Sequence, residues 1–153
     1  IAFPERLQDP QLELDFPPLI HAEVQDSFKS FRTLAYFSTT PRQMRFRKAS
    51  LKQWIEGGAV MGMGTDSGTP MNFHTEALWR EIKAHVDTGM SPLRAISAAT
   101  QVNARILGRS SDLGTVEVGK LADVIVVEGD PLFDITALSR VTTVIKNGEI
   151  QKN

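Results

Sequence analysis

The sequence contains no cysteine, only one tyrosine, and no long apolar run. The lack of cysteine excludes disulfides, zinc knuckles and thiol nucleophiles. No hydrophobic stretch approaches the roughly 20 residues that cross a bilayer. With 17 Lys and Arg against 18 Asp and Glu, the net charge of -1 offers no general attraction to nucleic acid or to acidic membranes. We therefore expect a soluble protein with neither nucleic acid nor membrane as a partner, and the composition indicates no compartment.

The 153 residues are enough for one domain with a real core, and 41% of them are hydrophobic. Apolar side chains recur at helical spacing through the first two thirds of the chain. Ser91-Pro92 is a typical helix start, and Gly57-Gly58 a typical helix stop. The predicted helices cover residues 22–37, the stretch from after Pro41 to Gly57, 75–87, the stretch from Pro92, and a short piece capped by Thr100 that ends at Gly108.

A short apolar run bounded by glycines, Ala59–Gly64, predicts a buried strand over about 59–65. Asp66 follows it, in the loop before the helix of 75–87. In α/β barrels and open sheets, functional residues lie where a strand ends and the loop to the next helix begins. Asp66 is thus a candidate catalytic residue. Alternatively, its carboxylate caps a turn, as aspartates near glycine often do.

After Gly108 the sequence changes from helical spacing to β-branched residues separated by turn residues. Asn147-Gly148, between two short apolar stretches, predicts a β-hairpin. We therefore divide the chain into a helix-rich part, 1–108, and a strand-rich part, 109–153.

An ordered series of short motifs makes the pattern more specific. It runs Gly64-Thr65-Asp66-Ser67-Gly68, His74, Gly89-Met90-Ser91-Pro92, Ala98-Ala99-Thr100, Ile106-Leu107-Gly108, Glu117-Val118-Gly119-Lys120-Leu121-Ala122-Asp123, Asp130-Pro131-Leu132 and Val144-Ile145-Lys146-Asn147-Gly148. In this order and spacing the series resembles the C-terminal part of the amidohydrolase superfamily, and especially its imidazolonepropionase-like and prolidase-like members. The resemblance covers residues 46–153 well and the earlier residues loosely.

The resemblance implies an α/β fold class, namely the C-terminal fragment of a (β/α)8 TIM barrel with strands of a small β-sandwich. Residues 1–108 would be the terminal barrel portion and 109–153 the sandwich portion. The family's enzymes hydrolyse C–N bonds, amide or peptide, in small or dipeptide-like substrates. Their cofactor is a divalent metal, zinc in the first place, which activates water.

Site residues follow from the same resemblance. Asp66 matches the family's aspartate on the last barrel strand, which binds metal and passes a proton to and from the activated water. His74, at the start of the next helix, is a candidate for substrate binding, and its alternative role is packing or capping at that helix. His85 is expected on a partly exposed helix face.

Most of the family's metal site has no counterpart in the sequence. There are three histidines, His21, His74 and His85, and no His-x-His pair. Because metal affinity comes from several preorganised ligands, one carboxylate holds a divalent ion weakly. We therefore expect the 153-residue chain alone to bind no catalytic metal and to turn over no substrate. We also expect it to self-associate, to borrow a partner chain, or to be completed by a missing N-terminal portion.

Two other functions stay open on the sequence. One is a non-catalytic, truncated copy that serves as a structural or oligomerising piece. The other is an aspartic protease of the retroviral type that uses Asp66-Ser67-Gly68, with a dimer supplying the second carboxylate. That protease fold needs β-structure after its aspartate, whereas residues 75–107 predict helices.

Overall fold

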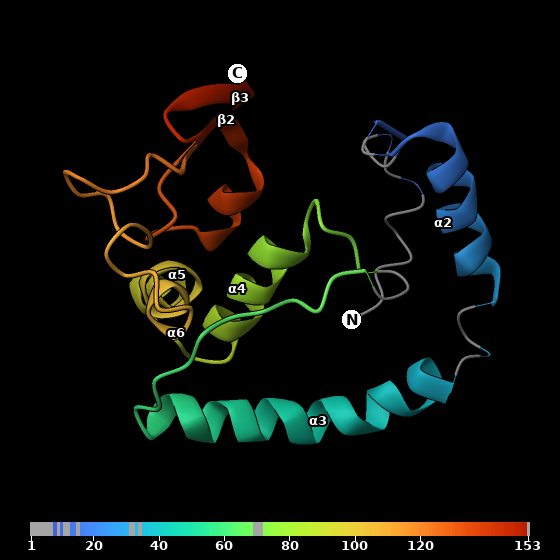
Figure 1. The fold of residues 1–153 in the computed structure, drawn as a ribbon. Helices are drawn as coiled ribbons and strands as arrows, with labels where there is room; N and C mark the ends of the chain where they lie inside the picture. The colour runs from blue at the N-terminus through green and yellow to red at the C-terminus, as the bar shows by residue number, and fades with distance from the viewer. Residues whose placement is uncertain are drawn as a thin grey trace. The chain divides into compact units, whose positions relative to one another are not determined.

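The computed structural model describes residues 8, 10, 13–14, 16–30, 33, 35–68 and 72–152 (Figure 1). The chain divides into two compact units. One comprises Ile1–Ser50 and Thr65–Ala77, and the other comprises Leu51–Gly64 and Leu78–Asn153. No helix in the described part of the chain is both long and apolar enough to cross a membrane.

Two helices occupy the first third of the chain, α2 (Pro18–Ser30) and α3 (Ala35–Glu56). Helix α2 begins on a proline, which fits the first helical position because the N–H there has no intrahelical partner. The single helix predicted over 22–37 is wrong, since α2 ends at Ser30 and a separate helix, α3, begins at Ala35. Phe31, part of the predicted helix, lies outside the described residues. The second predicted helix also begins earlier than expected, since Pro41 lies inside α3 and not before it. A proline at such a position costs the helix one backbone hydrogen bond.

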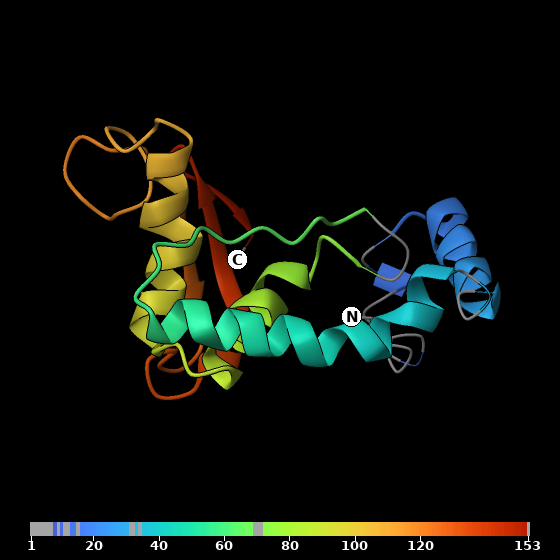
Figure 2. The ribbon, with the colours of Figure 1, turned by 90° about the horizontal axis from the view of Figure 1, so that it is seen from below.

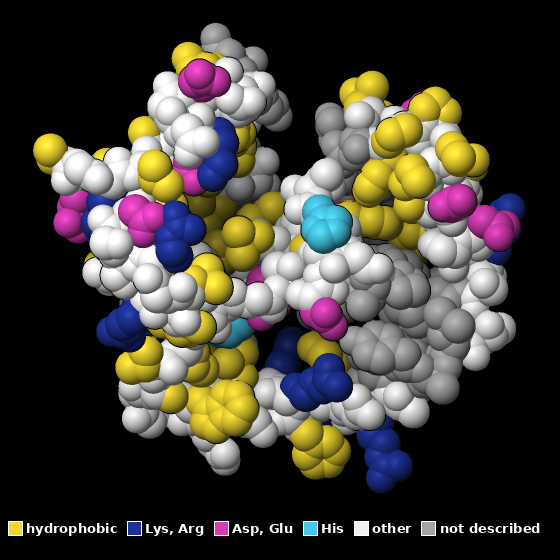
Figure 3. Space-filling model, viewed as in Figure 1, with side chains coloured by type: hydrophobic (Ala, Val, Ile, Leu, Met, Phe, Trp, Pro, Cys, Tyr) yellow, Lys and Arg dark blue, Asp and Glu magenta, His cyan; other side chains and the backbone are white. Residues whose placement is uncertain are grey.

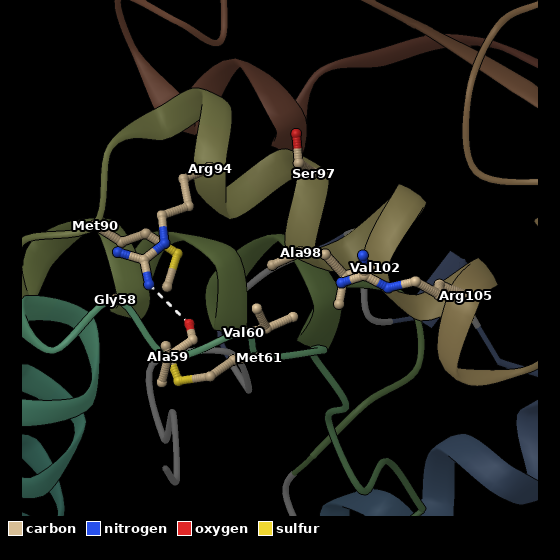
Figure 4. Close-up of a pocket in the computed structure, with 10 residues that line it drawn as sticks. All are labelled: Gly58, Ala59, Val60, Met61, Met90, Arg94, Ser97, Ala98, Val102 and Arg105. Atoms are coloured by element: carbon tan, nitrogen blue, oxygen red, sulfur yellow. Dashed lines mark hydrogen bonds between the residues drawn. The ribbon is translucent and has the colours of Figure 1, made fainter.

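The predicted stop at Gly57-Gly58 is confirmed, and Gly58 has φ +72°, which favours glycine. Carbonyl groups near the end of a helix lack intrahelical partners. The guanidinium of Arg94 donates to two carbonyls in this region, that of Ile55 at 2.9 Å and that of Ala59 at 2.8 Å, the second of which is drawn in Figure 4. Arg94 therefore fastens the end of α3 to a later helix of the same unit.

The second unit contains α4 (Ala77–Asp87, which starts at the unit boundary) and then a helical column. The column consists of α5 (Pro92–Ser97), a π turn (Ala98–Val102) and α6 (Asn103–Ile106), which follow one another without a break (Figure 2). The column replaces the two separate helices that the sequence predicted.

Of the two helix caps predicted in this column, the one at Ser91 is found in the structure and the one at Thr100 is not. The start is confirmed, because the Ser91 hydroxyl accepts a hydrogen bond from the Arg94 N–H at 3.4 Å. The cap at Thr100 is wrong, because its hydroxyl donates to the carbonyl of Ile96 at 2.8 Å within the column. A hydroxyl that bonds one turn back no longer marks a helix start.

The hydrophobic core of the second unit joins the end of α3, the segment 59–64, α4, the column and the 3-10 helix Ile135–Ser139. Its fully buried members are Ile55, Met63, Ile82, Met90, Ala95, Ala98 and Ile135. Helix α4 faces this core through Ile82 and Val86, which share one helix face at i, i+4 spacing. His85 is 8% exposed, so the expectation of a partly exposed histidine is wrong, and its Nδ1 lies 2.9 Å from the Glu81 carbonyl.

The strand predicted over about 59–65 is wrong for the chain as it stands, since no strand is formed over residues 59–66. A strand is defined by hydrogen bonds to a neighbour. The peptide groups of Val60, Met61 and Gly62 make no hydrogen bond to any other described residue. The segment passes through the unit as extended chain without a ladder (Figure 1).

The last part of the chain forms a three-stranded antiparallel sheet in the order β1 (Val124–Val127), β2 (Val141–Lys146) and β3 (Glu149–Lys152). The hairpin predicted at Asn147-Gly148 is confirmed, with φ values of +51° and +81°. A two-residue hairpin loop of this kind needs positive φ at both central positions.

Apolar side chains of this sheet reach the surface, and some are visible among the yellow atoms of Figure 3. Ile125, Val126 and Ile150 are exposed. Successive side chains of β1 point to opposite faces, so Ile125 and Val126 leave neither face of the sheet wholly polar. Val116 and Val118, also β-branched, lie outside the strands and are exposed.

Asp123 ties the hairpin to the start of β1 and gives a prediction about pH. It accepts a hydrogen bond from the Asn147 N–H at 2.8 Å and pairs with the Lys146 ammonium. The Lys146 hydrogen bond in the first place, followed by that of Asn147, lowers the pKa of Asp123 below its ordinary value. A lowered pKa in the folded state stabilises the fold above the ordinary pKa of about 3.9, and the stabilisation is lost as the pH falls through the lowered value.

We expect Asp123→Asn to lower the thermal unfolding midpoint at pH 6, with the gap to the wild type closing as the pH falls below about 4. Lys146→Met should show the same closing gap, because it removes the main cause of the lowered pKa. Thermal melts followed by circular dichroism from pH 6 to pH 2 measure both variants. A gap that stays constant over this range would contradict the role of the ionised carboxylate.

Candidate active site

Asp66 is exposed and stands directly after the extended segment 59–64 and Thr65. Its φ of +51° lies in the left-handed region. Among residues with a side chain, aspartate and asparagine tolerate this region best, because their short polar groups bond locally. Backbone of this kind persists where the surroundings hold it in place, and it is enriched at functional sites.

Side-chain and backbone hydrogen bonds close the loop around Asp66. The Asn72 amide donates to the Thr65 carbonyl at 2.6 Å, and the Gly68 N–H donates to the Asn72 carbonyl at 3.2 Å. The hydroxyls of Thr65 and Ser67, on either side of Asp66, lie 2.7 Å apart. Asp66 therefore sits in a loop whose two ends are tied together, while residues 69–71 lie outside the described part.

An aromatic cluster anchors the far end of this loop. Phe73 is buried, and its ring stacks on Phe28 of α2 with centroids 6.0 Å apart. The Phe16 ring meets Phe73 edge-on at 5.6 Å. All three belong to the same unit as Asp66, so burial of these rings fixes where the loop returns to helical structure.

His74 follows Phe73 and is exposed. Its Nε2 lies 3.7 Å from the point where a Cβ on Gly68 would stand. The imidazole thus folds back toward the residue two places after Asp66, and Gly68 leaves room beside it. The loop closure brings both predicted site residues, Asp66 and His74, onto one exposed loop.

The described residues place too few metal-binding side chains together for a metal centre. No group of three His, Cys, Asp or Glu side chains that could hold a metal ion occurs in residues 8–68 and 72–152 as far as the structure describes them. A catalytic zinc site uses three protein ligands and keeps one position open. Asp66 offers one carboxylate, so the described residues do not fit a complete metal centre.

A small hollow of ≈ 170 Å³ lies in the second unit, between the segment Gly58–Met61 and the helical column (Figure 4). Its charged lining groups are Arg94, which bonds to two carbonyls, and Arg105. Neither Asp66 nor His74 lines it. Since no lining residue can accept or donate a proton near neutral pH, the hollow is not a site of acid–base chemistry.

Two asparagines that were not among the predicted site residues hold the backbone before Asp66 and around its loop. Asn72 ties the loop, and Asn103 bonds the backbone of Met63. The sequence position of Asn103 could have indicated its role. Asparagine is unfavourable inside a helix, so one found there often makes a side-chain hydrogen bond that stabilises the fold.

Comparison with known proteins gives one family. A family model described as the Amidohydrolase family matches residues 45–151. The imidazolonepropionase of Shouchella clausii is 31% identical over 106 residues, which are 67% of this chain and 24% of that enzyme. A solved Xaa-Pro dipeptidase with bound methionine is 36% identical with a TM-score of 0.64, over 69% of this chain and 25% of that one. The solved structure of phenylurea hydrolase B is 33% identical with a TM-score of 0.60, and the match covers 65% of this chain and 25% of that one.

The chain spans about a quarter of the length of these relatives. In each case two thirds or so of the chain takes part in the match. The matched stretch of the family model contains the Asp66 loop, α4, the helical column and the three-stranded sheet.

Proposed function

Because the chain belongs to the amidohydrolase family, we propose that it is the C-terminal part of a metal-dependent hydrolase that cleaves C–N bonds in small amide or dipeptide-like substrates. The matched relatives include an imidazolonepropionase, a Xaa-Pro dipeptidase and a phenylurea hydrolase. The observation that carries the proposal is the exposed carboxylate of Asp66, held in a closed loop directly after an apolar extended segment.

In this proposal Asp66 performs the proton transfers of hydrolysis. Its carboxylate accepts a proton from the attacking water as the water oxygen bonds to the carbonyl carbon. It then returns the proton to the nitrogen as the C–N bond breaks, so the carboxylate is regenerated. An exposed carboxylate on a tied loop suits this role, because it can reach a substrate without moving the fold.

The proposal gives Asp66 a second role as one ligand of a divalent cation, zinc in the first place. Such a cation makes hydroxide available near neutral pH. Since the described residues do not complete a metal centre, its other ligands would come from polypeptide outside that described part.

We assign His74 to substrate contact. Its imidazole is exposed and folds toward Gly68, beside the proton-transfer group. A neutral imidazole both donates and accepts a hydrogen bond, which suits the amide or carboxylate of a dipeptide-like substrate.

For the fold, we propose that residues 1–108 end a (β/α)8 barrel and that 109–153 belong to a small β-sandwich. The open peptide groups of Val60, Met61 and Gly62 support the barrel, since added strands would pair with them. Exposed Ile125 and Ile150 support a second sheet over the first. The same open surfaces suit self-association, or completion by a missing N-terminal portion.

A non-catalytic, structural piece is the second candidate function. It is favoured by one observation, the lack of a three-ligand cluster in the described residues. The retroviral-type protease has no such support, because α4 and the column occupy the stretch where that fold needs strands.

The isolated 153-residue chain is expected to retain much less than one zinc or manganese ion per chain after desalting, and to hydrolyse no dipeptide. The reason is that one carboxylate does not make a tight site. Metal analysis and a dipeptide hydrolysis assay measure both results. The complete hydrolase that contains these residues serves as the positive sample.

The two samples separate the candidate functions. Stoichiometric metal and turnover by the isolated chain would contradict the need for further polypeptide. A complete protein that hydrolyses no C–N bond with either metal would contradict the catalytic proposal and leave the structural one.

A further inference from the structure

Asn72 makes two hydrogen bonds, one on either side of Asp66. Its side-chain amide donates to the Thr65 carbonyl at 2.6 Å, and its backbone carbonyl accepts from the Gly68 N–H at 3.2 Å. Thr65 directly precedes Asp66, and Gly68 follows two residues after it. One residue thus holds the backbone both before and after the exposed carboxylate.

The backbone at Asp66 needs such support. Its φ of +51° lies in a region that residues with a side chain rarely adopt, and such a conformation persists where the surrounding structure holds it. Asp66 is exposed, so burial of its side chain contributes little. The Thr65 and Ser67 hydroxyls, 2.7 Å apart, link loop residues only to one another. The bonds from Asn72 link the loop to a different stretch of the chain.

That stretch is anchored through the residue after Asn72. Phe73 is 8% exposed, and its ring stacks on the ring of Phe28 in α2. The Phe73 carbonyl also accepts from the N–H of Ala77, the first residue of α4, at 2.9 Å. All of these residues belong to the same compact unit as Asp66. Asn72 is therefore held next to a fixed point and can transmit that fixed position to the loop.

We infer that Asn72 is the positioning residue for Asp66. This inference rests on the proposed catalytic role of Asp66. The Thr65 carbonyl belongs to the peptide group that joins Thr65 to Asp66, and a peptide group is planar. A hydrogen bond to that carbonyl therefore also fixes the N–H and the Cα of Asp66, from which the carboxylate projects.

In this scheme Asn72 acts through a peptide group and touches no reacting atom. Without its side-chain bond the peptide plane before Asp66 can rotate, and a misplacement of about 1 Å at a catalytic group costs about 100-fold in rate. His74, the proposed substrate contact, directly follows the anchored Phe73 and keeps its place. The effect therefore falls on kcat and leaves KM near the wild-type value.

The test uses the complete hydrolase with Asn72→Ala, which removes the bond to Thr65 and keeps the backbone bond to Gly68. We expect kcat per folded enzyme to fall by up to about 100-fold, with KM little changed. Gln25→Ala is the matched control and should keep both constants, because Gln25 carries an exposed carboxamide on α2 of the same unit. Steady-state kinetics on one dipeptide substrate give both constants, and circular dichroism gives the amount of folded enzyme.

Asn72→Asp is the second variant, and it keeps the shape of the side chain in case the alanine variant does not fold. An ionised carboxylate only accepts hydrogen bonds, so it cannot donate to the Thr65 carbonyl. The kcat of this variant should therefore fall as well. Wild-type kcat in a folded Asn72→Asp enzyme would overturn the inference.

A double-mutant cycle distinguishes positioning from a purely structural role. Each Asn72 variant is combined with Asp66→Asn, and kcat is compared with that of Asp66→Asn alone. If Asn72 acts through the Asp66 carboxylate, its replacement should cost little once that carboxylate is gone, so the two losses do not add. A purely structural residue would cost the same factor in both backgrounds, and that result would refute the positioning role.

The outcome also separates this inference from the proposed function. If Asp66→Asn is inactive while the Asn72 variants keep their kcat, only the positioning role is wrong. If Asp66→Asn keeps its activity, the proposed function is wrong, whatever the Asn72 variants do.

Discussion

Replacing Asp66 by asparagine in the complete hydrolase should lower kcat by about 10²- to 10⁴-fold, the usual contribution of a positioned acid–base group. Asparagine has nearly the same shape and tolerates the φ of +51°, so the loop geometry survives. Its amide cannot take up a proton from water near neutral pH. The loss is therefore chemical, and the unfolding midpoint should stay close to that of the wild type because position 66 is exposed.

Asp87→Asn provides the control for this experiment. Asp87 is an exposed carboxylate at the end of α4 that pairs with Lys83. Exposed pairs of this kind contribute little to stability, so the variant should match the wild type in kcat and in unfolding midpoint. Steady-state kinetics on one dipeptide substrate measure all three enzymes. An Asp66→Asn enzyme as active as the Asp87→Asn enzyme would remove Asp66 from the reaction.

Gly114→Ala is expected to give the largest loss of stability, about 2–6 kcal/mol in the free energy of unfolding. Two costs combine. The φ of +94° strains any residue with a side chain. The new Cβ would also lie 2.6 Å from the Cβ of Ala104, which is buried, and 2.9 Å from the Cα of Gln101. Neither atom is the end of a flexible side chain, so the helical column itself would have to move.

Gly119→Ala separates the two costs. Gly119 has nearly the same φ, +91°, but nothing lies within 4 Å of its Cβ position. Only the backbone strain applies there, about 1–3 kcal/mol. Urea unfolding of both variants and the wild type gives the two free energies, and their difference reports the clash with the column. Equal losses in the two variants would contradict the close packing at Gly114.

The elements that the sequence predicted correctly are the ones set by neighbouring residues. Ser91-Pro92 starts a helix because a hydroxyl cap and a fixed φ both act within one turn. Asn147-Gly148 forms a hairpin because both residues accept positive φ. The position of Asp66, in a loop directly after an apolar run, was predictable for the same reason.

The features that the sequence did not predict correctly depend on residues that are far apart in the chain. Residues 59–65 have the composition of a strand, but a strand also needs a partner, and no other described segment pairs with them. His85 is buried, which the spacing of the apolar residues around it did not specify. The contact of Asn103 with Met63 joins positions 40 residues apart, so an asparagine inside a helix can indicate a role for its side chain but does not indicate Met63 as the partner.

The π turn also changes what a deletion in this helix would mean. A π turn holds one residue more than the regular α-helical repeat. Each residue of an α-helix advances the chain by about 100° around the axis. Because the wider winding of a π turn absorbs its extra residue, removing one residue from 98–102 would restore a regular α-helix in which Asn103 still points toward Met63. The same deletion in the regular helix α4 would turn every later side chain of that helix by about 100°.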